Sequence, residues 1–116
     1  WLDGDKRLSE PACDFIGEEA NTVFVSAASA WEIPTKVRIG KLPGAVEAVA
    51  GLAAAVTSQG FTELSISITD STRAGSLPGP LRDPFDRMLI AQAQALGVAL
   101  ISNDKVFDDY AIRRLW

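Results

Sequence analysis

Residues 83–104 read DPFDRMLIAQAQALGVALISND, and this stretch decides the fold class. Asp83 before Pro84 predicts the start of a helix, because an aspartate caps free backbone N–H groups and proline suits the first turn. Gly97 predicts the left-handed residue that ends this helix. Residues 98–101 are all apolar, which is typical of a strand buried on both faces within a parallel sheet.

Helices and strands are expected to alternate along the rest of the chain. The patterns predict further strands at residues 22–26, 61–68 and 112–116, and further helices at residues 9–19, 27–40, 44–58, 69–75 and 105–110. Such alternation predicts an α/β fold, in which helices cover both faces of a central parallel sheet to give three α/β/α layers. With 116 residues and neither repeats nor a linker, the chain is expected to be a single domain, residues 1–116.

The composition excludes several kinds of chemistry. Histidine is absent, so Ser-His-Asp and Cys-His catalysis and imidazole zinc sites are excluded. The net charge of −4 argues against a nonspecific nucleic-acid coat, which would be basic. The single cysteine, Cys13, cannot form an internal disulfide, which suits a reducing cytoplasm, and it is expected to be a small buried residue. No apolar run approaches the roughly 20 residues of a membrane span, and the chain opens without a signal-peptide pattern.

Carboxylates therefore carry the possible chemistry, and three of them stand near the ends of predicted strands. Asp104 directly follows the apolar strand, Asp86 lies in the first turn of a helix amid apolar residues, and Glu32 lies in the helix that follows residues 22–26. In parallel sheets, ligands bind beyond the carboxyl ends of the strands. Each acid also has a simpler reading: Asp104 as a helix cap, Asp86 as a partner of the helix dipole, and Glu32 as a solvated side chain.

Taken together, three carboxylates from three junctions could converge on one edge of the sheet. Hard oxygen ligands of this kind suit Mg²⁺ or Mn²⁺. Such an ion activates water and neutralises the charge that develops on phosphorus, and it would attract a polyanionic substrate to an acidic protein.

Three blocks of sequence resemble a known family. They are residues 26–33 (SAASAWEI) with residues 36–42 (KVRIGKL), residues 83–93 (DPFDRMLIAQA), and residues 101–104 (ISND) with Phe107. Their order and spacing resemble those of PIN-domain toxins of the VapC type, over essentially the whole chain. The resemblance implies a small PIN-like α/β domain and a Mg²⁺-dependent endoribonuclease, with Mn²⁺ as an alternative ion. It also implies a homodimer, inhibited by a cognate VapB-type antitoxin and reaching DNA only through that antitoxin.

The resemblance assigns roles to individual residues. It implies that the catalytic, metal-binding acids are Glu32, Asp86 and Asp104. Residues expected to support this site, or to hold phosphate, are Asp83, Ser102, Arg82 and Arg87.

The sequence departs from the family pattern in three places. The family's first acid ends an N-terminal strand inside the sheet, and no such strand precedes Asp3 or Asp5, so the chain is expected to be an N-terminally shortened form with impaired activity. Leu81 stands where relatives often carry histidine. Pro34 follows Glu32 in an expected helix, where an interior proline costs about 3 kcal/mol. Either the helix begins near Ser29, which would place Pro34 close to the first turn, or a kink moves Glu32.

Two other classes of function compete with the nuclease. One is a binding module that occupies an antitoxin or regulates a promoter. Its apolar surface would be Trp31, the Val37-to-Leu42 region and the alanine-rich helix from Ala45 to Val56, each of which could instead pack in the core. The other is a receiver or phosphatase domain, which also uses acids at strand ends but needs a lysine for which Lys105 is the weak candidate.

Overall fold

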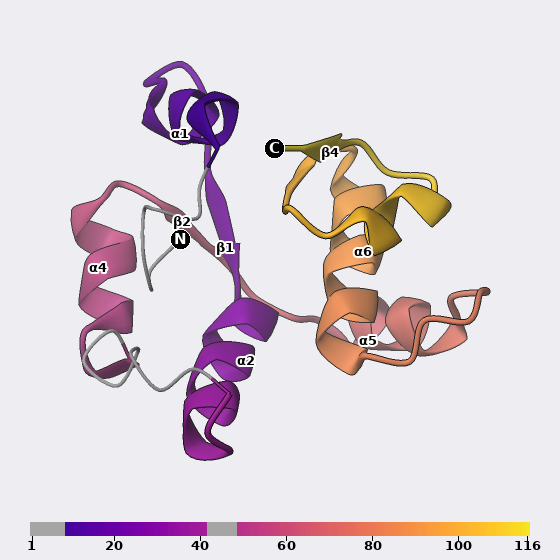
Figure 1. Cartoon of the computed structure of the whole chain (residues 1–116). Coiled ribbons are helices and arrows are strands. Elements are labelled where there is room, and N and C mark those ends of the chain that lie inside the picture. Colours follow the sequence, from indigo (N-terminus) through magenta and orange to yellow (C-terminus); the bar gives the residue numbers. More distant parts are fainter. Residues whose placement is uncertain (1–8, 42–48) are drawn as a thin grey trace.

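The computed structural model describes residues 9–41 and 49–116, and Figure 1 shows their arrangement. In chain order the elements are α1 (Glu10–Gly17), β1 (Phe24–Ser26), α2 (Ala27–Arg38), α4 (Leu52–Ser58), β2 (Thr62–Leu64), α5 (Ile68–Ser76), α6 (Pro84–Leu96), β3 (Leu100–Ile101), the 3-10 helix η2 (Lys105–Asp109) and β4 (Arg114–Leu115). The helix expected over residues 44–58 lies partly outside the described residues. No helix in the described part of the chain is long and apolar enough to cross a membrane.

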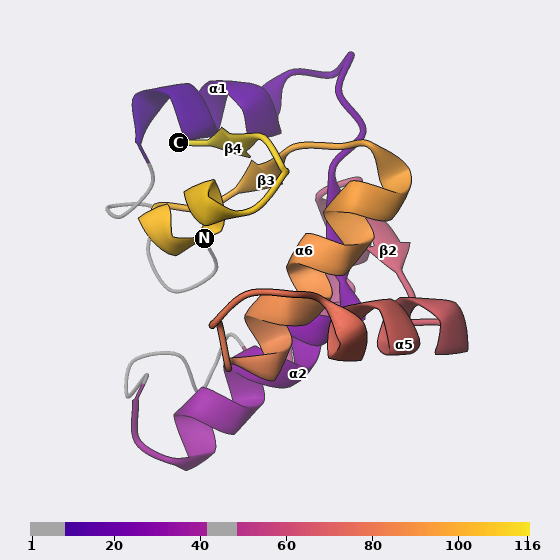
Figure 2. The same cartoon turned by 90° about the vertical axis from the view of Figure 1, so that its right-hand side faces the viewer.

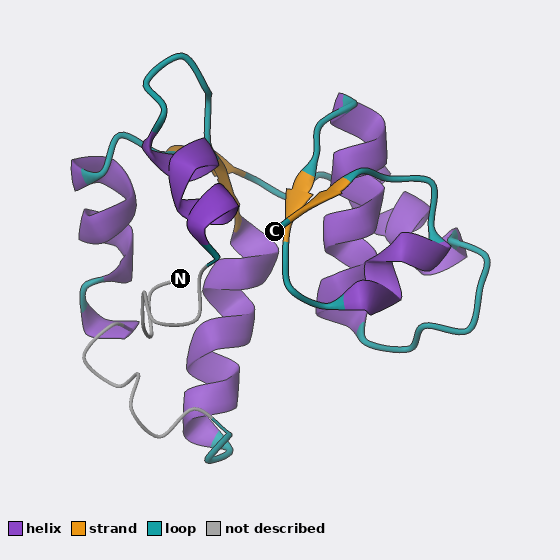
Figure 3. Cartoon of the chain, turned by 45° about the horizontal axis from the view of Figure 1, so that its top comes forward, coloured by secondary structure: helices purple, strands orange, loops and turns teal. Residues whose placement is uncertain are grey.

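All the strand pairs are parallel, as the alternation of helices and strands predicted. β1 pairs with β2, Phe24 lying opposite Thr62, and β3 pairs with β4, Leu100 lying opposite Arg114. The predicted α/β fold class is therefore confirmed. One central sheet was expected, whereas the four described strands form two separate two-stranded sheets (Figure 3). They stay separate because no described strand lies between them to pair with both.

Helix α6 is the central element of the packing. It contacts α5, α2 and β3, and Figure 2 shows it rising from α2 and α5 towards β3. Ile90 and Ala91 of α6 are fully buried. The other buried apolar side chains are Ala12, Ala28, Leu52, Val56, Ala74, Ala93 and Phe107. Because most of these are small, the helices approach α6 closely, and this brings the N-terminal half of α6 next to α2.

The boundaries of α6 follow the sequence signals. The Asp83 carboxylate accepts hydrogen bonds from the N–H groups of Phe85 and Asp86, at 2.9 and 3.1 Å. Gly97 adopts φ 66°, in the left-handed region that glycine enters without steric cost. The prediction of a helix from Pro84 to Leu96, with these two caps, is confirmed.

The strand predicted over residues 61–68 ends earlier, at Leu64, because a helix begins at Ile68. The Ser67 hydroxyl accepts a hydrogen bond from the Asp70 N–H, and the Asp70 carboxylate accepts one from the Ser67 N–H. This reciprocal capping box satisfies two free N–H groups and outweighs the apolar alternation.

Two further expectations were wrong. Helix α2 begins at Ala27, with Ser26 as its cap, so Pro34 lies inside the helix rather than near its first turn. Cys13 is exposed rather than buried, because the buried residue of α1 is Ala12.

Candidate metal centre

Three carboxylates converge where α2 meets the start of α6. Glu32 comes from the second turn of α2, Asp83 caps α6, and Asp86 lies in the first turn of α6. One oxygen atom from each of the three lies within 4.8 Å of the others, and all three residues are half-buried. We call this set the acidic triplet. Two of its members, Glu32 and Asp86, are acids that the sequence singled out, and Asp83 was expected only to support them.

The electrostatics of the acidic triplet favour a bound cation. Burial, together with the negative charges of Asp83, Glu32 and Asp104, raises the pKa of Asp86 to about 6. Like charges held this close destabilise one another unless a proton or a cation compensates them. A divalent ion bound by carboxylate oxygens would relieve the repulsion, so the donor set fits Mg²⁺ or Mn²⁺.

Lys36 already compensates part of this charge. Its ammonium lies 2.6 Å from a carboxylate oxygen of Glu32, four residues earlier on α2. Its hydrogen bond to Glu32 raises the pKa of Lys36, and the charges of Asp83 and Asp86 add to the effect. The sequence analysis did not single out Lys36, although its spacing from Glu32 on a predicted helix was a usable signal.

Asp104 lies outside the acidic triplet but close enough to raise the pKa of Asp86. Its side chain is exposed and caps η2, with Oδ1 accepting a hydrogen bond from the Val106 N–H at 3.0 Å. The Ser102 hydroxyl accepts a hydrogen bond from the Asp104 N–H at 3.0 Å, and so orients the loop that carries this acid. The capping role weighed for Asp104 is therefore present in the structure, while its second oxygen is left for other contacts.

The two arginines differ in their surroundings. Arg82 is exposed, directly before Asp83. Arg87 instead donates to main-chain carbonyls, from Nε to Ala74 at 3.0 Å, from Nη1 to Leu81 at 2.7 Å, and from Nη2 to Leu77. These bonds direct the guanidinium into the loop between α5 and α6. Arg87 thus fixes the segment that delivers Asp83, a role that the sequence analysis missed.

Gln92 is a second positioning residue that the sequence analysis missed. Its amide is buried, and its oxygen accepts a hydrogen bond of 2.6 Å from the Ser26 hydroxyl. Its nitrogen donates to the Ser65 carbonyl at 3.1 Å and to the Asp70 carboxylate at 3.2 Å. Gln92 therefore ties the ends of β1 and β2 to α6. Its one sequence signal was a polar residue within an apolar helix face.

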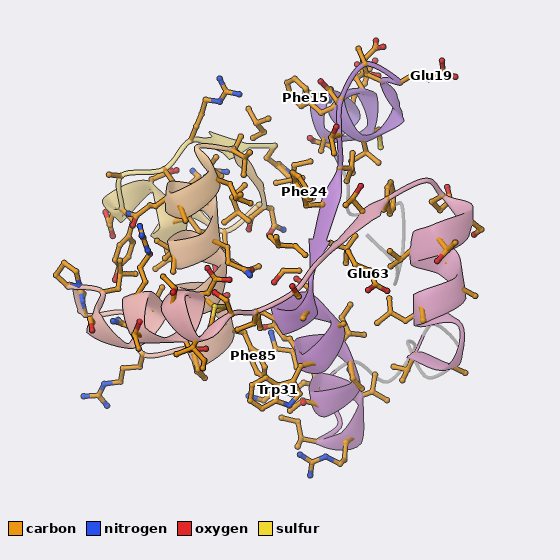
Figure 4. The ribbon with its side chains drawn as sticks, turned by 180° about the vertical axis from the view of Figure 1, so that it is seen from behind. Phe15, Glu19, Phe24, Trp31, Glu63 and Phe85 are labelled. Atoms are coloured by element: carbon orange, nitrogen blue, oxygen red, sulfur yellow. The ribbon has the colours of Figure 1, made fainter. Side chains whose placement is uncertain are left out.

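Aromatic side chains border the acidic triplet. Trp31 is 63% exposed, and its ring meets that of Phe85 edge-on, with centroids 4.9 Å apart (Figure 4). Each ring is adjacent in sequence to a triplet acid, Glu32 or Asp86. Trp31 is therefore not a core residue, which was the simpler of its two expected roles.

Parallel strands, helices packed across them and an acidic triplet beyond the carboxyl end of β1 define the class: an α/β domain with a cluster of carboxylates that could hold a metal ion. The chain belongs to the PIN domain family, whose model matches residues 1–113. PIN domains are generally nucleases that use divalent metal ions. No curated protein and no solved structure matches the chain.

Proposed function

We propose that this protein is a metal-dependent endoribonuclease that hydrolyses RNA phosphodiester bonds. The observation that carries the proposal is the acidic triplet of Glu32, Asp83 and Asp86, within 4.8 Å of one another in a PIN domain. Glu32 and Asp86 would hold the ion as ligands, with Asp104 as a further ligand and Asp83 beside them. The ion, Mg²⁺ or Mn²⁺, would supply an activated water and a positive charge for the phosphate.

Other residues of this chain would attract the phosphate backbone and position the acids. Lys36 and the exposed Arg82 are cations next to the acidic triplet that could draw in the phosphate backbone. Arg87 and Ser102 act as positioning residues, because their hydrogen bonds hold the loops that carry Asp83 and Asp104. The polyanion would therefore be recognised locally by a protein whose net charge is −4.

We further propose the biological setting that the VapC-type resemblance implies. The protein would be a cytoplasmic toxin of a toxin–antitoxin system, a homodimer inhibited by a VapB-type antitoxin, and would reach DNA only through that antitoxin. Residues 1–116 would act as a single PIN domain in this setting.

The test is cleavage of single-stranded RNA under a Mg²⁺ or Mn²⁺ titration, with and without a chelator. A Glu32→Gln, Asp86→Asn double variant should lose the metal-dependent cleavage. Asp14→Asn, which removes an exposed carboxylate of α1, is the matched control and should retain it. If the wild type gives no cleavage at saturating metal and without antitoxin, or if the double variant cleaves as fast as the wild type, the catalytic assignment fails.

A second candidate, an antitoxin-binding or regulatory module, is favoured by one observation. Trp31 and Ile39 of the α2 region are 63% and 52% exposed, and exposed apolar side chains on one element could form part of a patch that a partner covers. A pull-down with the same double variant separates the two functions. Retained antitoxin binding with lost cleavage supports the enzyme, whereas no change in either supports the module.

A further inference from the structure

Tyr110 directly follows η2 and contacts the loop between α5 and α6, residues 77–83, which we call the α5–α6 loop. The Tyr110 hydroxyl accepts a hydrogen bond of 3.2 Å from the Leu81 N–H, a residue 29 positions earlier in the chain. Figure 1 shows η2 and the α5–α6 loop both beside α6. Tyr110 therefore joins the C-terminal segment of the chain to the loop that leads into α6.

Gly79 of the α5–α6 loop is fitted to the tyrosine ring. A Cβ atom at Gly79 would lie 2.6 Å from the Tyr110 hydroxyl oxygen and 3.0 Å from Cζ, closer than real Cβ atoms approach other heavy atoms. Gly79 also has φ 107°, a backbone conformation that only glycine adopts readily. The phenol of Tyr110 thus packs directly on the main chain of the loop, where no larger residue leaves room for it.

Leu81 is held at both of its peptide groups. Its N–H donates to Tyr110, and its carbonyl accepts a hydrogen bond of 2.7 Å from Nη1 of Arg87. Arg87 also donates to the carbonyls of Ala74 and Leu77. Side chains from α6 and from the end of η2 therefore hold the loop at several points, which limits the conformations open to its backbone.

The two segments that Tyr110 joins each carry an acid of the candidate metal centre. The α5–α6 loop ends at Asp83, whose Oδ1 accepts both of the hydrogen bonds that cap α6. Asp104 caps the start of η2, again through Oδ1. In both acids the capping bonds fix the carboxylate plane, so the position of Oδ2 follows the position of the helix start.

Helix η2 transmits the position of Tyr110 to Asp104. Asp104 is its N-cap and Tyr110 its C-cap, and Phe107 between them is 3% exposed, which anchors η2 in the core. A 3-10 helix rises about 2 Å per residue, so five residues keep the two caps at a fixed spacing. A contact at Tyr110 therefore constrains where Asp104 lies relative to the α5–α6 loop.

We propose that Tyr110 is a positioning residue that fixes the separation between Asp83, with the rest of the acidic triplet, and Asp104. It contacts neither the ion nor the substrate and acts through the α5–α6 loop and η2. Its packing on Gly79 sets the distance between the two segments, and its hydrogen bond with Leu81 sets their register. The effect on metal binding rests on the proposed function, whereas the positioning of the two segments does not.

The first measurement is amide hydrogen exchange of the whole chain without metal. Tyr110→Phe removes the hydroxyl and keeps the ring, so the Leu81 amide should exchange about fivefold faster, as for the loss of one net hydrogen bond. The amides of Phe85 and Asp86, which report the Asp83 cap, should also exchange faster. Thr57→Val is the control, because it removes a hydroxyl of α4 that bonds within its own helix, and it should leave these amides unchanged.

The second measurement is Mn²⁺ affinity by isothermal titration calorimetry. We expect Tyr110→Phe and Gly79→Ala each to lower the affinity about 10-fold, as changes behind metal ligands commonly do. Gly60→Ala is the matched control for backbone strain, since Gly60 has φ 75° but no atom of the described residues lies within 4 Å of the added Cβ. Gly60→Ala should therefore leave the affinity unchanged.

A double variant tests whether Tyr110 acts on the separation of the acids. When Asp104 is already Asn, Tyr110→Phe should lower the Mn²⁺ affinity by only about twofold or less, because residues that act through one another give non-additive effects. An undiminished 10-fold loss in the Asp104→Asn background would contradict a role of Tyr110 towards Asp104. A purely structural tyrosine would lower the urea midpoint and leave the affinity of the folded protein unchanged.

The outcomes separate this proposal from the metal centre itself. Unchanged Mn²⁺ affinity in both Tyr110→Phe and Gly79→Ala would overturn the proposal, as would equal Leu81 exchange in Tyr110→Phe and the wild type. An equal loss of affinity in Gly60→Ala would attribute the effect to strain and overturn it too. If the wild type binds no Mn²⁺, the proposed function fails. The Phe85 and Asp86 amides then decide alone whether Tyr110 positions Asp83, and unchanged exchange there overturns that positioning.

Discussion

The carboxyl ends of the two strand pairs hold their acidic residues in different ways. Beyond β1 and β2, the acidic triplet is half-buried, and the buried Gln92 amide joins Ser26, Ser65 and Asp70 in one network. Beyond β3 and β4, Asp104 is exposed and caps η2, and the nearby ion pair of Asp108 and Arg114 lies at the surface. Both ends carry acidic residues, but only the carboxyl end of the β1–β2 pair holds them together in a half-buried cluster.

This difference teaches that a position after a parallel strand does not by itself make an acid functional. Asp86 and Asp104 both stand at helix starts near strand ends, and both have backbone roles available. Burial and the neighbouring carboxylates raise the pKa of Asp86 to about 6. A carboxylate in such a setting gains from a bound cation, whereas an exposed cap gains little.

The largest expected effect is on metal binding. Asp86→Asn should lower the affinity for Mn²⁺ by about 100-fold or more, because it removes a proposed ligand from the half-buried triplet. Asp104→Asn should lower it by about 10-fold or less, since Asp104 lies outside the triplet. Isothermal titration calorimetry measures both, with Asp108→Asn as the control that removes an exposed acid. Equal losses of Mn²⁺ affinity in the Asp86→Asn and Asp104→Asn variants would contradict the expected difference and show that both residues are equivalent ligands.

The next effect is on stability. Gln92→Ala should lower the free energy of unfolding by about 2–3 kcal/mol, because it removes a buried amide and leaves the buried Ser26 hydroxyl without its acceptor. Asp108→Ala should lower it much less, because its pair with Arg114 is exposed although bidentate. Urea unfolding measures both, and Gln94→Ala on the same helix controls for the loss of a glutamine. Equal losses of unfolding free energy for Gln92→Ala and Asp108→Ala would show that the hydrogen bonds of Gln92 stabilise the fold no more than the exposed ion pair does.

The pH dependence of stability gives a smaller effect, carried by Asp86. Its folded pKa of about 6 exceeds the ordinary aspartate value of 3.8, so the folded protein binds this proton more tightly than the unfolded chain. The stability of the wild type relative to Asp86→Asn is therefore greatest below pH 4 and should fall as pH rises to about 6. We expect a fall of about 1 kcal/mol, since solvent screens a partly buried carboxyl.

Metal-free unfolding at several pH values measures this difference. The Asp86→Asn reference is essential, because the pKa values of Asp70 and Asp108 are lowered by their hydrogen bonds, and these groups act in the opposite direction. A flat difference between wild type and variant would mean that the triplet is better solvated than its geometry indicates.

Local sequence signals were sufficient for much of the fold. Asp83, Pro84 and Gly97 defined α6 because caps and turns depend on neighbouring residues only. The end of β2 was misjudged because the capping box of Ser67 and Asp70 outweighed apolar alternation. The two separate sheets were not foreseeable, since strand pairing depends on which segments meet in space.

The acidic site was predictable in part for the same reason. Glu32 was recognisable from its position after a predicted strand and Asp86 from its apolar surroundings, whereas the approach of Asp83 depends on how α2 packs against α6. Gln92 and Arg87 bond to residues up to 66 and 13 positions away, respectively, so no local pattern indicates their partners. Such tertiary hydrogen bonds decide which of several similar acids are brought together.

The smallest expected effect is on the free energy of unfolding, and it separates helix capping from charge at Asp83 and Asp104, which both cap helices. Asparagine caps helices as well as aspartate does, so Asp83→Asn and Asp104→Asn keep both caps and remove one charge each. In the absence of metal, Asp83→Asn should raise the free energy of unfolding by a few tenths of a kcal/mol, because it removes a charge that opposes the ionisation of Asp86. Asp104→Asn should change it less, because its carboxylate is exposed.

Alanine variants complete this test. Asp83→Ala and Asp104→Ala should each lose about 0.5–1 kcal/mol as their caps disappear. Thermal unfolding at pH 7 without metal resolves the four variants when each is compared with the wild type. If Asp83→Asn destabilised the protein as much as Asp83→Ala, the aspartate would act through its charge on the helix dipole. Repulsion within the acidic triplet would then be too weak to drive metal binding, and the contrast with Asp104 would rest on burial alone.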